Sequence, residues 1–406
     1  MTMTALSNTD AALVTLLRRS LCGSEESVTL TAEEWRALVL RAYAGGVFSL
    51  SYDGFLTLKE GDAVRDSMQA HLPAAWSMLF EEKQAACRQV TLARARLSSA
   101  FREARLTHLF LNTASYQDYP SPALRESEAV EFLIDRADRP ACERVLSALG
   151  IQGSKDADGV SYIMHDILSV QIADEQAAAR LRSLLARALD TVDNVALNDC
   201  TLSVPSLPVR ALLLLLDAKI ALDEGRLSLP LLLDFAMLTE SHFRERDMHT
   251  TLSSWKQCGL LDTAKLLAAA ASKLLALPPL DWFTDVDECK ADEVIALALS
   301  PDEAMLLKAE ETLQAAICME EARIEEERRA SRLTARTAAK ASEMKRHALD
   351  SARKRYPAVK KHPVLLIGAL PCDLILNGLS SCLPSKKKQK QASKGSDSTH
   401  ERRKTK

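Results

Sequence analysis

Glu131 is the side chain whose setting points most directly to metal chemistry. It lies in the segment Ala129–Ile134, a short and largely apolar run of the kind that forms a buried strand. Residues at i and i+2 of a strand project from the same face, so two carboxylates at that spacing can bind one divalent cation through hard oxygen ligands. Ala129 stands two residues before Glu131, so this strand offers one carboxylate where such a site needs two.

Groups that could bind an anion precede this strand. Another apolar run, residues 106–111, ends at Asn112 and Thr113, and the segment YPSPALR follows at residues 119–125. A turn after a strand binds phosphate best when glycine lets backbone N–H groups approach closely and lysine adds a charge. Asn112 has no charge and Thr113 carries a Cβ atom, so this turn is weakened, whereas Arg125 can still bind an anion.

This layout resembles the uncharacterised nucleotidyltransferase family of the polymerase-beta superfamily. In that family a strand ends in Lys-Gly, a Tyr-Pro-x-Pro-x-x-Arg segment follows, and an Asp-x-Asp strand carries the metal-binding carboxylates. Asn112 and Thr113 stand here in place of Lys-Gly. Ala129 and Glu131 stand at the two Asp positions, and Arg125 matches the Arg of the motif.

Other segments are also similar to patterns of that family. They are residues 34–39 (EWRALV), residues 230–238 (PLLLDFAML, like Leu-x-x-Asp-Leu-Ala), and residues 353–366 with Tyr-Pro and Pro-x-Leu-Leu. The resemblance thus extends over most of residues 30–380.

The resemblance implies Mg²⁺-dependent transfer of a nucleotide from a nucleoside triphosphate, with a metal site that is degraded in this chain. Glu131 is the expected metal ligand and catalytic residue. The third acid of the family aligns with Gln171, a neutral amide, or with Asp166 if the register slips. We therefore expect a weakly active or inactive protein, a pseudoenzyme that acts by binding a nucleotide or a partner.

Two alternatives remain open at this point. One is an active Mg²⁺-dependent nucleotidyltransferase in which Glu131 and a displaced acid, such as Asp166, are catalytic. The other is a structural or membrane-peripheral adaptor that uses a charged helix and a basic tail. The acceptor substrate and any protein partner are not indicated by these residues.

The same side chains also have purely structural interpretations. Asn112, Thr113 and Arg125 are the predicted nucleotide-binding residues, but Arg125 could instead form an ion pair between two elements. Glu131 could be a partly exposed carboxylate paired with such an arginine. His165 could belong to a proton relay, although a histidine with satisfied hydrogen bonds at a strand edge is the more common case.

The elements that must position these residues predict an α+β protein that is mainly α-helical. Strand-like runs at residues 106–111, 129–134 and 159–172 flank a helix over residues 139–149, which Gly150 ends. This order predicts a small nucleotidyltransferase-like α/β palm embedded between helical regions.

Capping signals and helical periodicity define the remaining regions. Thr31 followed by Glu34 has the spacing of a capping box, and residues 77–104 carry an amphipathic pattern. The predicted regions are an N-terminal helical region (1–103), the palm (104–178), a helical domain (179–300), a long charged helix with an apolar C-terminal segment (301–383) and a disordered basic tail (384–406).

The long charged helix and the apolar segment after it each suggest a further interpretation. A coiled-coil arm is less favoured than a solvated helix packed on the body, because the apolar positions hold no strict heptad. Residues 363–383 have the length of a membrane span, but Asp373 and Asn377 inside them are costly in hydrocarbon.

Composition and charge limit the function further. The 9 cysteines form no Cys-x-x-Cys pair, which favours reduced thiols over disulfides or a zinc site. The first residues lack a secretory-signal pattern, so a cytoplasmic location is predicted.

The chain has a net charge of −3, and residues 386–406 carry +7, which leaves −10 for the rest. Such a body predicts no specific nucleic-acid binding, while the basic tail could make weak contact with an anionic membrane.

Overall fold

The computed structural model describes most of the 406 residues and forms two compact units, Met1–Ala322 and Arg323–Lys406. The described residues are 6–58, 72–111, 118–126, 129–151, 154–156, 160–166, 183, 192–197, 200–243, 249–280, 283 and 286–355. The apolar segment 363–383 and the basic tail therefore lie outside the described residues, as do Asn112, Thr113 and Gln171. None of the helices in the described ranges is long and apolar enough to cross a membrane.

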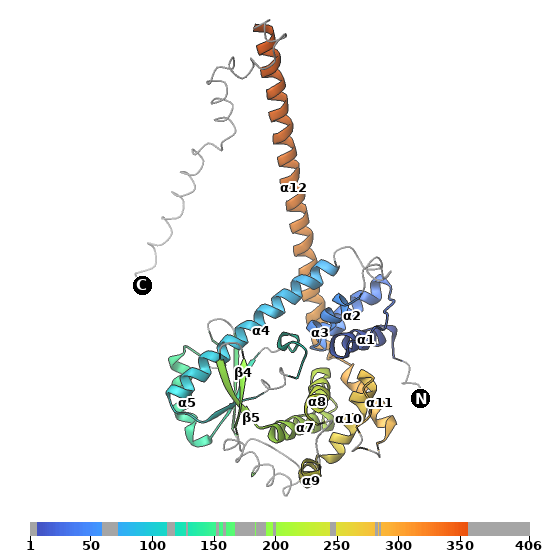
Figure 1. Ribbon diagram of the computed structural model, residues 1–406, viewed down its shortest axis with the longest axis vertical. Helices are drawn as coiled ribbons and strands as arrows, with labels where there is room; N and C mark the ends of the chain where they lie inside the picture. The colour runs from blue at the N-terminus through green and yellow to red at the C-terminus, as the bar shows by residue number, and fades with distance from the viewer. Residues whose placement is uncertain are drawn as a thin grey trace, which may run out of the picture. The chain divides into compact units, whose positions relative to one another are not determined.

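The fold is α+β and mainly helical, as the sequence predicts (Figure 1). The helices before the palm are α1 (Asn8–Cys22), α2 (Ala32–Ala44), α3 (Phe48–Leu56) and α4 (Leu72–Glu103). The predicted capping box is present at the start of α2, where the Thr31 side chain accepts a hydrogen bond from the Glu34 backbone N–H and the Glu34 side chain accepts one from the Thr31 N–H. Local sequence signals therefore define where this helix begins.

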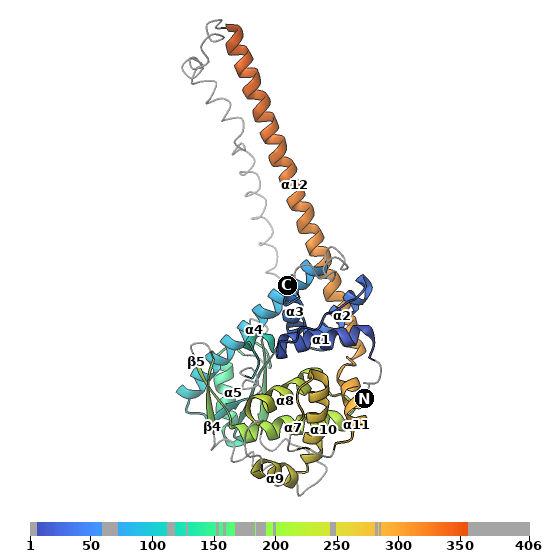
Figure 2. The same ribbon diagram turned by 45° about the vertical axis from the view of Figure 1, so that its right-hand side comes forward.

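Helix α4 belongs to two hydrophobic cores. Its first turns bury Leu72, Trp76 and Leu79 in a helical core, and its last turns bury Leu97 and Phe101 in the core of the palm. Figures 1 and 2 show it running from the neighbourhood of α3 to the strands of the palm. A single long helix thus connects the palm rigidly to the helical part of the same unit.

The palm contains a three-stranded sheet in the order β1-β2-β3. Its elements are β1 (His108–Phe110), the 3-10 helix η2 (Pro122–Leu124), β2 (Ala129–Ile134), the 3-10 helix η3 (Arg136–Asp138), α5 (Arg139–Ala148) and β3 (Ser161–Asp166). β1 pairs antiparallel with β2, and β2 pairs parallel with β3 through the crossover helix α5. The predicted strand at 129–134 is confirmed residue for residue.

A second small sheet departs from the sequence prediction. We expected helices to return at residue 179, but β4 (Val192–Leu197) and β5 (Cys200–Pro205) form an antiparallel hairpin. Its buried side chains Val195, Leu202 and Val204 belong to the palm core. The segment was misjudged because its alternating pattern is short, whereas packing against α4 and β1 is what stabilises it as a hairpin.

The second helical region follows the hairpin and contributes most of the helical core. Its helices are α7 (Leu207–Asp223), α8 (Leu229–His242), α9 (His249–Gln257), α10 (Leu261–Leu275) and α11 (Glu288–Ala298). The last helix, α12 (Glu303–Arg355), confirms the predicted long charged helix. Its first turns bury Ala309, Leu313 and Ala316 in the first unit.

Candidate functional site

The two faces of the palm sheet have different environments. Val130, Phe132 and Ile134 of β2 are buried in the palm core. Glu131 and Leu133 alternate with them and therefore lie on the opposite face, where Leu133 joins the helical core. The strand pattern thus directs Glu131 away from the palm interior and toward the side of the sheet that the helical region covers.

Glu131 lies beside a histidine of the neighbouring strand. In the β2–β3 register Glu131 is paired with Ile163, and His165 is two residues further along on the same face. The Glu131 Oε2 and His165 Nε2 atoms are 3.5 Å apart, and the two side chains are 28% and 39% exposed. His165 therefore contacts Glu131, a pairing that the sequence-based interpretation of either residue did not include.

A third titratable group reaches this pair from the helical region. Asp217 of α7 is open to solvent on one side, yet protein atoms crowd its carboxyl group on the others. Desolvation, followed by the nearby charge of Glu131, raises the pKa of Asp217 to about 6, and His165 opposes this rise. We call Glu131, His165 and Asp217 the palm cluster.

The palm cluster does not fit Mg²⁺ well. Mg²⁺ takes oxygen ligands in near-ideal octahedral geometry, whereas an imidazole lies within 3.5 Å of the Glu131 carboxylate here. Across the described ranges, no group of three or more His, Cys, Asp or Glu side chains is arranged to hold a metal ion. The described donors thus differ in chemistry from the two carboxylates of an Asp-x-Asp strand.

Asp166, the other acid that the sequence singles out, is the last residue of β3. It is paired with Ile134 of β2. Its side chain, like the predicted nucleotide-binding residues Asn112 and Thr113, lies outside what the structure describes.

Arg125, the other predicted anion-binding residue, forms a bidentate ion pair with a buried carboxylate. Its Nε donates to Asp234 Oδ1 at 2.8 Å and its Nη2 donates to Asp234 Oδ2 at 2.9 Å. Asp234 is in α8, and its side chain is only 5% exposed. The Tyr119 hydroxyl donates a further hydrogen bond to Asp234 Oδ1 at 2.8 Å. This bidentate geometry is the strongest form of an arginine–carboxylate contact.

These bonds explain why two separate sequence motifs occur together. Tyr119 and Arg125 are the first and last residues of the YPSPALR segment, and Asp234 is the acid of the LLLDFA segment. Their direct contact connects the loop between β1 and β2 to helix α8. In this conformation the Arg125 guanidinium holds the loop in place.

A neighbouring ion cluster reinforces the same loop. Asp118 Oδ1 lies 2.7 Å from His242 Nε2, and Asp118 Oδ2 lies 3.8 Å from an Arg210 nitrogen. Burial raises the pKa of Asp118, and the charges of Arg210 and His242 oppose that rise. Arg210 is in α7 and His242 ends α8, so Asp118 connects the loop to both helices.

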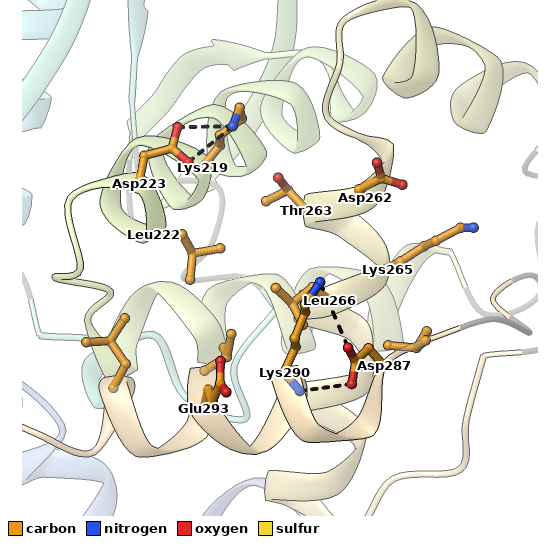
Figure 3. Close-up of a pocket in the computed structure, with 13 residues that line it drawn as sticks. Lys219, Leu222, Asp223, Asp262, Thr263, Lys265, Leu266, Asp287, Lys290 and Glu293 are labelled. Carbon is orange, nitrogen blue, oxygen red and sulfur yellow. Dashed lines mark hydrogen bonds and ion pairs between the residues drawn. The ribbon is translucent and has the colours of Figure 1, made fainter.

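A pocket of about 550 Å³ lies elsewhere in the same unit, between α7, α10 and α11 (Figure 3). Ion pairs border it on two sides, Lys219 with Asp223 and Lys290 with Asp287. Its lining mixes these charges with leucine and valine side chains. It contains no residue that the sequence marks for chemistry, so we do not assign the site to it.

The chain thus combines a small α/β palm, packed against helices, with a carboxylate on its middle strand. The family described as uncharacterised nucleotidyltransferase matches residues 31–276 of the chain. The chain therefore belongs to the uncharacterised nucleotidyltransferase family. Searches of curated proteins and of solved structures gave no match.

Sequence reasoning found only part of this site. It identified Glu131 and Arg125, and it marked Asp234 as part of a family pattern without a partner. Asp217 and Arg210 gave no signal, because each is one polar residue within the strongly apolar helix α7. The charge of each within an apolar run is at most a weak clue, because a charged group needs solvent or a partner.

Proposed function

We propose that this protein is a nucleotidyltransferase-family member with a degraded metal site, weakly active or inactive, that acts by binding a nucleotide or a partner. The carrying observation is the chemistry at β2: Ala129 replaces one carboxylate, and the remaining one, Glu131, contacts His165. Two-metal catalysis needs several oxygen ligands around each ion. One carboxylate beside an imidazole is a poor basis for such a site.

The arginines around the palm support the same proposal. Arg125 is engaged by Asp234, and Arg210 lies near the buried Asp118. Guanidinium groups held in this way are less available to neutralise a triphosphate. The nucleotide-binding roles of Asn112, Thr113 and Arg125 therefore remain predictions that binding measurements must test.

Calorimetric titration of the full chain with ATP, CTP, GTP and UTP tests this proposal. We expect any nucleotide affinity to be nearly the same with Mg²⁺ and with EDTA, and turnover to be slow or absent. Glu131→Ala should leave that affinity unchanged, and Arg139→Ala, in an exposed pair with Glu143, is the matched surface control. Affinity that collapses in EDTA would overturn the degraded-site proposal.

An active Mg²⁺-dependent enzyme is the second candidate, and the position of Asp217 favours it. This carboxyl group comes close enough to Glu131 for their charges to interact, so it is a candidate for the displaced acid. On this alternative, Glu131→Ala and Asp217→Asn each abolish metal-dependent nucleotide turnover. Asp223→Asn, also on α7 but paired with Lys219, is the control and keeps turnover. Turnover that survives Glu131→Ala excludes Glu131 as the metal ligand.

We also infer a reducing, cytoplasmic location. The six cysteines whose side chains the structure describes are free thiols, as expected where disulfides do not persist. Mass spectrometry of protein alkylated at lysis, before and after reduction, tests this. Disulfide-linked peptides from freshly lysed cells would contradict it.

A further inference from the structure

A strongly basic stretch of the described chain lies on α12. Residues 328–347 contain seven Lys or Arg and one Glu, a net charge of +6 within a chain whose total is −3. Every described side chain from residue 326 to residue 347 is exposed. The net charge of the whole chain does not reveal this segment, because acidic residues elsewhere offset its positive charge.

Most of the basic side chains share one side of the helix, where Glu343 also lies, whereas Lys345 is on the opposite side. Arg328, Arg332, Arg336 and Lys340 follow one another at i+4 spacing, and Arg346 returns to the same side five turns after Arg328. We call these five residues the basic face. None of the five has a hydrogen bond or ion pair within the part of the chain that the structure describes, so their charges are available to a ligand.

The rest of this segment offers neither a broad apolar surface nor aromatic side chains. The side opposite the basic face carries small residues, namely Ala330, Ser331, Thr334, Thr337, Ala338 and Ala341. Leu333 and Met344 are the bulky apolar residues of 328–347, and α12 contains no Phe, Trp or Tyr. Helices that lie in a membrane interface present a broad apolar face with bulky side chains, and this segment lacks one.

We propose that the basic face binds the phosphate backbone of double-stranded nucleic acid without sequence specificity. The spacing from Arg328 to Arg346 corresponds to about 27 Å of helix, along which a duplex presents about 16 phosphates. Four of the five basic groups are guanidinium forks, which bind phosphate in a bidentate manner. The helix has no aromatic side chain on which bases could stack, so we assign the contact to the backbone. This inference does not depend on the palm or on its proposed function.

Fluorescence anisotropy with the full chain and a duplex DNA of about 20 base pairs tests the proposal. The quadruple variant R328Q, R332Q, R336Q and K340Q should bind at least about tenfold more weakly at about 0.1 M salt, with a shallower salt dependence. Glutamine keeps helix propensity, and circular dichroism verifies that α12 is intact. Duplexes of two unrelated sequences should bind equally.

The matched control places four glutamines on the opposite side, at Ser331, Thr334, Thr337 and Ala341. This variant should bind DNA like the unmodified chain. Equal binding by both variants would overturn the proposal, since the contact would then lie elsewhere, as on the basic tail. A failure of the unmodified chain to bind duplex DNA would also overturn the proposal. The same holds if the chain binds vesicles containing phosphatidylserine through the basic face but does not bind duplex DNA.

Discussion

Replacing Arg125 with alanine tests whether this residue stabilises the fold or serves an anion. The change removes two hydrogen bonds, of 2.8 and 2.9 Å, from a carboxylate whose side chain is 5% exposed. The Tyr119 hydroxyl would still donate its hydrogen bond to Asp234 Oδ1. Breaking a buried pair costs about 3–5 kcal/mol, and since Arg125 is itself 20% exposed we take about 3 kcal/mol.

This loss corresponds to a measurable change in melting temperature. For a unit that extends from Met1 to Ala322, an unfolding entropy of about 2 cal/mol/K per residue gives about 0.7 kcal/mol per kelvin, so Tm should fall by about 4 °C. Differential scanning calorimetry measures this shift, and urea unfolding checks the free energy. Tyr119→Phe should cost less, about 1.5 kcal/mol, because it removes one hydrogen bond to a charged group.

The outcome distinguishes the two roles of Arg125. Arg139→Ala, which breaks an exposed pair with Glu143, is the control and should change stability by less than about 1 kcal/mol. If Arg125→Ala is as harmless as this control and yet removes nucleotide binding, the structural reasoning is refuted. Arg125 would then be the anion-binding residue that the family motif predicts.

Three further predictions concern buried groups. Burial lowers the pKa of His108 in the folded chain, so the contribution of its neutral form to stability is full above about pH 6.5 and is lost as pH falls through the folded-state pKa. On acidification from about pH 7.5 to about pH 5, the Tm of His108→Phe should therefore fall less than the Tm of the unmodified chain. A Cβ atom on Gly54 would lie 2.0 Å from the Leu16 carbonyl oxygen, so Gly54→Ala should cost at least about 2 kcal/mol in urea unfolding, and a neutral result would contradict the close α1–α3 packing. Burial raises the pKa of Cys142 to about 11, so peptide mapping should find it alkylated at least about 100-fold more slowly at pH 8 than the exposed Cys289; similar rates would argue against its burial.

Local signals in the sequence account for much of the fold. The strand at Ala129–Ile134 and the capping box at Thr31 and Glu34 are found where the residues predict them. The helix that ends at Arg355 also begins within two residues of the predicted position. Each of these features depends on residues within a few positions of one another, through side-chain periodicity or a bond between a cap and its own helix.

The hairpin at residues 192–205 shows where local reasoning fails. Its alternating pattern is short, and its buried residues Val195, Leu202 and Val204 gain their stability from the palm core. Isolated two-stranded hairpins are marginal in water, so the decision between strand and helix here belongs to tertiary packing.

The candidate site depends still more on the tertiary structure. The sequence by itself determined that β2 carries a single carboxylate at Glu131 and that Arg125 ends a conspicuous motif. Only the folded chain decided that Arg125 meets Asp234, 109 residues away, and that Glu131 faces His165 with Asp217 close by. The physical reason is that a charged group interacts with the groups that lie within a few ångströms of it. These neighbours come from helices whose sequences specify an apolar face, but not which strand or loop that face will cover.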